Sequence, residues 1–147
     1  MSGRTSIEWM RRTHRMMPLT PQERSISDLL IEMRLPFESH HVFEFSPKVR
    51  MSVDFLIFSG SGIVLECTYC SRRRSSALWE LKRRCTFINY RFGQVKRALP
   101  SIVCGALVEA PKEDEEQIRL EAAPILDKAD FVACSIERLE ASIKECR

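Results

Sequence analysis

Apolar residues recur at two different spacings along the chain, and these spacings divide it into predicted helices and strands. Residues 20–23 (Thr-Pro-Gln-Glu) combine a helix N-cap, a proline at the first helical position and a glutamate at the third. Apolar residues then follow at helical spacing, so a helix is expected until Pro36 ends it. A second helix is expected over residues 76–99, where apolar residues alternate at spacings of 3 and 4 to form one buried stripe that Pro100 ends.

Five shorter apolar segments are typical of β-strands. They cover residues 42–45, 51–58, 63–69, 102–108 and 131–135. The segment Gly60-Ser61-Gly62 predicts a hairpin turn between the second and third of them. The uninterrupted apolar run 102–108 is typical of a strand that is buried on both faces.

Two further helices complete the predicted fold. An acidic helix is expected over residues 112–128, with Pro124 breaking its last turn, and Ser135 is expected to cap a final helix that reaches about Cys146. The resulting order, α-β-β-β-α-β-α-β-α, predicts a single α/β domain with a mixed sheet flanked by helices. Residues 20–147 would form this domain, and residues 1–19 a basic N-terminal arm.

The charge is unevenly distributed. The net charge of the 147 residues is only +3, but residues 69–99 contribute nine basic residues and one acid, and residues 100–147 are acidic. A basic segment beside an acidic one is expected of a surface that faces a polyanion next to a metal site. A solvated helix face would explain the same pattern.

Composition points to a cytoplasmic protein that does not enter a membrane. No apolar run approaches the ~20 residues that span a bilayer, and the first residues lack the apolar core of a secretory signal. The six cysteines are therefore expected to be reduced. Cys67 and Cys70 have the spacing of a metal or redox motif, but the other cysteines are scattered, so buried thiols are the simpler interpretation, with an iron–sulfur cluster as an alternative.

Asp54 and Glu66 are the only acids in the two strands of the predicted hairpin. An acid in an apolar strand is costly unless it is paired or binds a metal. A three-residue loop would set Asp54 opposite Thr68 and leave Glu66 as its diagonal neighbour on the same face, whereas a two-residue loop would put the two acids on opposite faces. Two clustered carboxylates suit Mg²⁺ or Mn²⁺. The alternative is that each acid pairs with an arginine.

The arrangement resembles the PD-(D/E)XK nuclease superfamily, in which an acid on the first helix precedes an Asp in the second strand and a Glu-X-Lys motif in the third. Glu23, Asp54 and Glu66 match the three acids, and the likeness, over about residues 20–110, is strongest to the very-short-patch-repair-like branch. The resemblance implies a restriction-endonuclease-like fold, a Mg²⁺ or Mn²⁺ ion held by Asp54 and Glu66 with Glu23 nearby, and hydrolysis of DNA.

The sequence departs from the family at the motif lysine, which is replaced by Thr68. A threonine offers a hydroxyl but no charge. Lys82, on the long helix, is the residue we expect to supply the missing cation, and loss of catalysis with retained binding is the other explanation. The basic residues expected to contact phosphates are Arg11, Arg12, Arg15, Arg72, Arg73, Arg74 and Arg83.

Three other signals have two interpretations each. Glu23 could close a capping box with the N-cap instead of serving a metal. The pair His40-His41 could touch phosphate, but a solvated position at a strand edge is the simpler interpretation. Trp79 could stack on a base, although a core or interface role is more common for tryptophan.

The sequence thus predicts a Mg²⁺- or Mn²⁺-dependent, nuclease-like protein that acts on DNA, with Asp54, Glu66, Glu23, Thr68 and Lys82 at its site. A catalytically inactive nucleic-acid-binding module on the same fold is the second hypothesis, and a structural or interaction protein is the third. The oligomeric state is left open by the sequence; the resemblance adds a homodimer as one alternative, because small nucleases of this kind often pair to cut two strands.

Overall fold

The computed structural model describes residues 18–70 and 75–146, and these residues form one α/β domain with a five-stranded mixed sheet flanked by four helices. The predicted fold class and order of elements are confirmed. In chain order the elements are α2 (Pro21–Glu32), β1 (Phe37–Ser46), β2 (Val49–Ile57), β3 (Ile63–Tyr69), α3 (Ser75–Ala98), β4 (Val103–Glu109), the 3₁₀ turn η1 (Lys112–Asp114), α4 (Glu115–Ala122), β5 (Phe131–Ala133) and α5 (Ile136–Glu145).

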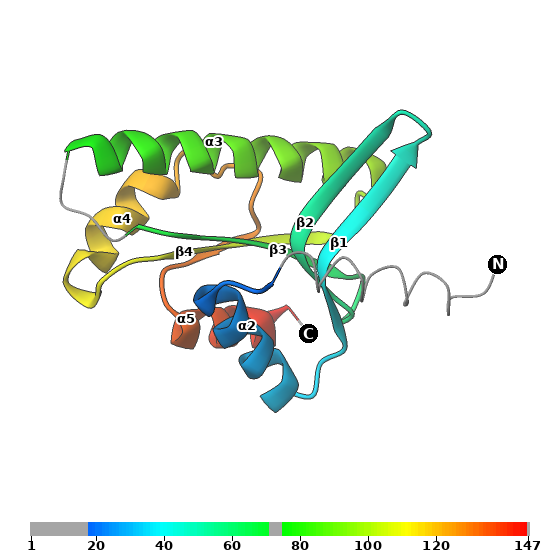
Figure 1. Cartoon of the computed structure of the whole chain (residues 1–147), viewed down its shortest axis with the longest axis horizontal. Coiled ribbons are helices and arrows are strands. Elements are labelled where there is room, and N and C mark those ends of the chain that lie inside the picture. Colours follow the sequence, from blue (N-terminus) through cyan, green and yellow to red (C-terminus); the bar gives the residue numbers. More distant parts are fainter. Residues whose placement is uncertain (1–17, 71–74, 147) are drawn as a thin grey trace.

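The strands lie in the order β1-β2-β3-β4-β5. The pairs β1–β2 and β2–β3 are antiparallel, whereas β3–β4 and β4–β5 are parallel and are joined by helical crossovers. The long helix α3 lies with α4 on one side of the sheet, and α2 and α5 lie on the other (Figure 1). The sheet is therefore the middle of three layers, as expected for an α/β domain.

Each side of the sheet has its own apolar core. The apolar stripe of α3, including Leu81, Cys85 and Phe92, packs on one face, and Ile26 and Leu30 of α2 pack on the other. Burial of the predicted stripe is confirmed for its central positions, but Leu99 is 40% exposed because α3 ends one residue earlier. The core thus fixes which flank of α3 faces the end of the sheet where the candidate site lies.

The hairpin β2–β3 has a longer turn than predicted. The pairs Phe55↔Leu65 and Ile57↔Ile63 leave five residues, 58–62, in the turn, and Gly60 and Gly62 take positive φ angles of 59° and 103°. The predicted register, with Asp54 opposite Thr68, is wrong by two positions. The turn nevertheless contains an odd number of residues, so Asp54 and Glu66 stay on the same face, as the prediction required.

The strand β2 leaves its neighbour β3 at Asp54. Its pairing with β3 spans Phe55 to Ile57, whereas its pairing with β1 continues to Val49. The outer half of the β1–β2 hairpin extends past the sheet toward α3 (Figure 1), where Phe43 and Met51 pack against the core under that helix. Asp54 therefore lies at the point where two strands separate and a cleft begins.

Two predicted elements have different limits. β1 begins at Phe37 rather than near Val42, because its pairing with β2 extends to Phe37↔Ile57. The predicted helix 112–128 consists of η1 followed by α4, which ends at Ala122. Pro124 cannot donate a backbone hydrogen bond and its ring clashes with the preceding turn, so the helix stops before it.

In the described part of the chain, no helix combines the length and apolar character that a membrane span requires.

Candidate active site

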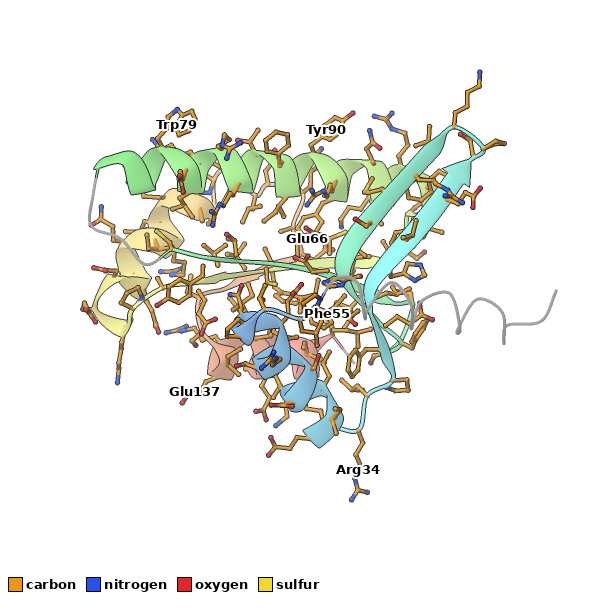
Figure 2. All side chains as sticks on the ribbon, in the orientation of Figure 1. Arg34, Phe55, Glu66, Trp79, Tyr90 and Glu137 are labelled. Atoms are coloured by element: carbon orange, nitrogen blue, oxygen red, sulfur yellow. The ribbon has the colours of Figure 1, made fainter. Side chains whose placement is uncertain are left out.

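Two carboxylates from neighbouring strands meet under α3. Asp54 comes from β2 and Glu66 from β3, and Figure 2 shows Glu66 between α3 and the sheet. Where the strand pairing stops, the side chains replace it: the Asp54 N–H donates to Glu66 Oε1 (3.1 Å), and the Cys67 N–H donates to Asp54 Oδ2 (2.9 Å). The two acids are thereby held side by side by backbone groups of each other's strands.

Burial makes both negative charges unfavourable. Glu66 is only 2% exposed, and this burial, reinforced by the charge of Asp54 and opposed by Arg91, raises the pKa of Glu66 to about 7. The pKa of Asp54 is also raised, first by burial and then by the charge of Glu23, although hydrogen bonds from Cys67 act in the opposite direction. Such a pair gains free energy from any cation that enters between the carboxylates.

The flank of α3 that faces this pair is basic. Arg91 Nη1 donates to Glu66 Oε2 at 2.8 Å, and Arg84 Nη1 donates to Thr68 Oγ1 at 3.2 Å and to the Tyr69 carbonyl at 3.4 Å. Arg84 and Arg91 are seven residues apart, which is close to two helical turns, so both point to the same side of the helix. The alternative that each acid pairs with an arginine is confirmed for Glu66 but not for Asp54, which forms no ion pair with an arginine among the described residues.

Two adjoining hollows surround the carboxylates. The larger, of about 690 Å³, lies between the start of α2 and the end of β3, and the smaller, of about 350 Å³, lies between β3 and α3. The residues that line both are Asp54, Cys67, Thr68 and Arg84. These shared walls make the two hollows parts of one cleft, with Asp54 and Arg84 at their junction.

Glu23 closes the capping box of α2. Its Oε1 accepts the Thr20 N–H at 2.9 Å, while Thr20 Oγ1 accepts the Glu23 N–H at 3.1 Å, and its Oε2 lies 2.8 Å from His40 Nε2. Burial would raise the pKa of Glu23, but the bonds from Thr20 and His40 outweigh it and lower that pKa. Glu23 thus stays charged at the edge of the larger hollow.

The three predicted acids do not form a ready-made cluster. Within residues 18–70 and 75–146, no group of three or more His, Cys, Asp or Glu side chains is arranged to hold a metal ion. Asp54 and Glu66 remain as a two-carboxylate pair, which is the number that Mg²⁺ commonly takes from a protein before water and phosphate oxygens complete its shell. The pair fits such an ion, and a ligand role for Glu23 stays a prediction.

Among the other predicted site residues, Thr68 and Arg83 line the cleft and Lys82 does not. Thr68 is buried, and its hydroxyl accepts the bond from Arg84. Arg83 lines the smaller hollow and lies 5.6 Å from the ring centre of Trp79. Lys82 is exposed on α3 and lines neither hollow. The predicted phosphate contacts Arg11, Arg12, Arg15 and Arg72–Arg74 lie outside the described residues.

Sequence reasoning missed the importance of Arg84, Arg91 and His40. The two arginines lie four residues before and three residues after the buried Ile88, so the sequence alone shows that they share one side of the helix. Whether that side faces the acids depends on the tertiary packing. The interpretation of His40 as a solvated residue is wrong, because its side chain is 11% exposed and contacts Glu23. The core interpretation of Trp79 is also wrong, because Trp79 is 65% exposed.

The six cysteines are unpaired in the structure. Burial raises the pKa of Cys85 to about 11 and that of Cys104 to about 12, and it also raises the pKa of Cys67, which contacts the Asp54 carboxylate. These thiols are therefore poor nucleophiles.

Comparisons of the chain with protein-family models, with curated proteins and with solved structures found no match.

The wild type is expected to lose stability as the pH rises, and replacing Glu66 by Gln should prevent this loss. The folded-state pKa of Glu66, about 7, lies above its ordinary value of 4.5, so its stabilising contribution is complete below about pH 4.5 and is lost as the pH rises toward 7 and beyond. Between these limits the free energy of unfolding of the wild type should fall, relative to the variant, by on the order of 3 kcal/mol. Urea unfolding in EDTA at fixed ionic strength measures this difference.

The matched control is Glu32→Gln, which makes the same chemical change at an exposed position of α2. Parallel pH profiles for the wild type and Glu66→Gln would contradict the expectation. Added Mn²⁺ at high pH should restore stability to the wild type and not to Glu66→Gln, because the ion compensates the charge that burial disfavours.

Proposed function

We propose that this chain is a metal-dependent, nuclease-like protein that hydrolyses phosphodiester bonds in DNA. The observation that carries the proposal is the meeting of Asp54 and Glu66, two coupled carboxylates from adjacent strands, beneath a helix whose facing flank is basic. Carboxylates and arginines in one cleft match the two needs of this chemistry, a site for a divalent cation and donors for phosphate oxygens.

The residues that would hold Mg²⁺ or Mn²⁺ are Asp54 and Glu66. Both hydrogen bonds to the Asp54 carboxylate from the described residues use Oδ2, which leaves Oδ1 for a ligand, and Glu66 would exchange its contact with Arg91 for the ion. When bound, such an ion lowers the pKa of an attacking water and offsets charge on the phosphate. Glu23, which contacts His40, would lie beside the ion, and its charge would add negative potential at Asp54.

The chain's own cations would position the substrate. Arg91, released from Glu66, and Arg84, at the junction of the two hollows, present planar guanidinium groups that bind phosphate through two parallel hydrogen bonds. Arg84 would take the place of the family's lysine, because its guanidinium already contacts the hydroxyl of Thr68 at that position. Arg83 and the predicted basic residues outside the described part would add salt-sensitive contacts along the strand.

A catalytically inactive nucleic-acid-binding module is the second candidate, and one contact favours it. Glu66 already has a partner for each oxygen, the Asp54 N–H at 3.1 Å and Arg91 at 2.8 Å, so both oxygens are hydrogen-bonded without a metal. In that case the arginines would still bind phosphate, but no water would be activated. The two candidates differ in metal uptake and in turnover.

The test uses the full chain with Mn²⁺ and with EDTA on labelled duplex, branched and single-stranded DNA. The nuclease proposal expects a rise in melting temperature on addition of Mn²⁺ and cleavage products that EDTA abolishes. Salt-sensitive DNA binding with neither metal uptake nor products would favour the inactive module. Absence of metal uptake, cleavage and DNA binding together would overturn both.

A further inference from the structure

The outward side of α3 carries three large aromatic side chains. Trp79 is 65% exposed, Phe87 56% and Tyr90 66%. Figure 2 shows Trp79 and Tyr90 pointing away from the sheet, on the side of the helix opposite the buried stripe. None of the three belongs to either apolar core, and exposed aromatic residues grouped on one helix face are typical of a surface that binds a partner.

Two of these aromatic groups have a partner on the same helix, and one of the partners is a cation. The guanidinium of Arg83 lies 5.6 Å from the ring centre of Trp79, and the Tyr90 hydroxyl accepts a hydrogen bond of 2.6 Å from Gln94. We call Trp79, Arg83, Phe87 and Tyr90 the aromatic strip. Both ends of the strip are held in place by these contacts, so its rings are oriented before any partner arrives.

The aromatic strip adjoins the carboxylate cleft. Phe87 and Arg83 line the smaller hollow together with Asp54 and Glu66, and Phe87 is at the same time exposed. From Trp79 to Tyr90 the helix advances about 16 Å. A chain of several nucleotides that crossed the strip would therefore bring one of its phosphates to the carboxylates.

We propose that the aromatic strip binds unpaired nucleotides, so that the substrate at the cleft is a single-stranded segment of nucleic acid; this inference rests on the function proposed above. Aromatic side chains stack on bases whose faces are open, and every base has such a face. A duplex hides those faces and offers mainly phosphates. A second copy of the chain fits less well, because it would set the arginines of two α3 helices against each other.

The experiment measures binding in EDTA, where cleavage does not interfere. Fluorescence anisotropy compares a labelled oligo-dT strand, an oligo-U strand and a duplex of the same length on the wild type and on a Trp79→Ala, Tyr90→Ala double variant. The variant should bind the single strands about tenfold or more weakly, whereas its duplex affinity, which depends on phosphate contacts, should change little. Tighter binding of oligo-dT than of oligo-U by the wild type would identify DNA as the preferred strand, and the reverse would identify RNA.

The control is Phe58→Ala, an aromatic residue that is 49% exposed but lies in the β2–β3 turn and outside both hollows. Melting temperatures check that all variants fold. An equal loss for duplex and single strand, or no loss for either, would overturn the inference. The inference would also be overturned if the double substitution converted a dimer into a monomer and left single-strand binding unchanged, because the strip would then be a contact between copies.

Failure of this inference and failure of the proposed function can be distinguished. Strand preference is measured without metal, and hydrolysis is measured with Mn²⁺ on every substrate. Cleavage of duplex DNA by a protein whose aromatic strip is dispensable would retain the nuclease proposal and reject the strip. Stacking-dependent single-strand binding without hydrolysis would retain the strip and reject catalysis.

Discussion

Replacing Asp54 by Asn is expected to lower Mn²⁺-dependent cleavage by about a thousandfold or more. The amide has nearly the shape of the carboxylate but no charge, so the remaining acid, Glu66, cannot hold the ion against the nearby Arg91. A bound metal contributes several kcal/mol to the transition state, and each ~1.4 kcal/mol corresponds to a factor of ten in rate. Single-turnover cleavage at saturating Mn²⁺ measures the loss, and isothermal calorimetry measures metal binding.

The matched control is Asp28→Asn, an exposed acid on the outer side of α2. A second readout separates a local charge effect from misfolding. The charge of Asp54 is one cause of the raised pKa of Glu66, so removing it should lower that pKa and shift the pH dependence of stability to lower pH. Unchanged cleavage by Asp54→Asn in a folded protein would end the catalytic proposal.

The order and limits of most elements could be predicted from local signals. The N-cap Thr20, the proline that follows it and the glutamate of the capping box fixed the start of α2, and Ser135 caps α5 as expected. These signals act within a few residues, so the sequence displays them directly. Pro124 also stopped a helix, but two residues earlier than its own position, because a proline disturbs the turn before it.

The register of the hairpin could be predicted only in part. An odd number of turn residues was required to bring two acids to one face, and five residues satisfy that requirement as well as three do. Nothing local in the sequence distinguishes these lengths. Gly60 and Gly62 take positive φ angles in the five-residue turn, a conformation that glycine permits in a shorter loop as well.

The partners of the acids could not be predicted, because they depend on how α3 is rotated on the sheet. Lys82, Asn89 and Lys96 recur every seven residues and share one flank, where Asn89 binds Asp127 and Lys96 binds Asp130. Arg84 and Arg91 share the other flank, which faces Thr68 and Glu66. Lys82 thus lies on the flank opposite the one that faces the acids, and its part in catalysis stays a prediction.

The replacement Arg84→Gln is expected to lower the cleavage rate by about a hundredfold. The proposed hydrolysis needs a cation near Thr68, which is itself buried and uncharged. Arg84 Nη1 contacts Thr68 Oγ1 at 3.2 Å, and the residue lines both hollows, so it is the described cation best placed to offset charge on a phosphate held between them. A fixed donor aimed at developing charge has an effect of this size because the site around it is already organised.

Two further substitutions make this expectation specific. Arg84→Lys keeps the charge but lacks the planar fork, so it should recover part of the lost rate. A purely structural role in bridging Thr68 and Tyr69 would not be restored by lysine at all. Arg97→Gln removes a cation from the exposed end of the same helix and serves as the matched control. Lys82→Gln decides between the two flanks of α3. If that variant, rather than Arg84→Gln, lost activity, the cation would come from the flank that the sequence suggested, and the placement of Arg84 in the site would be wrong.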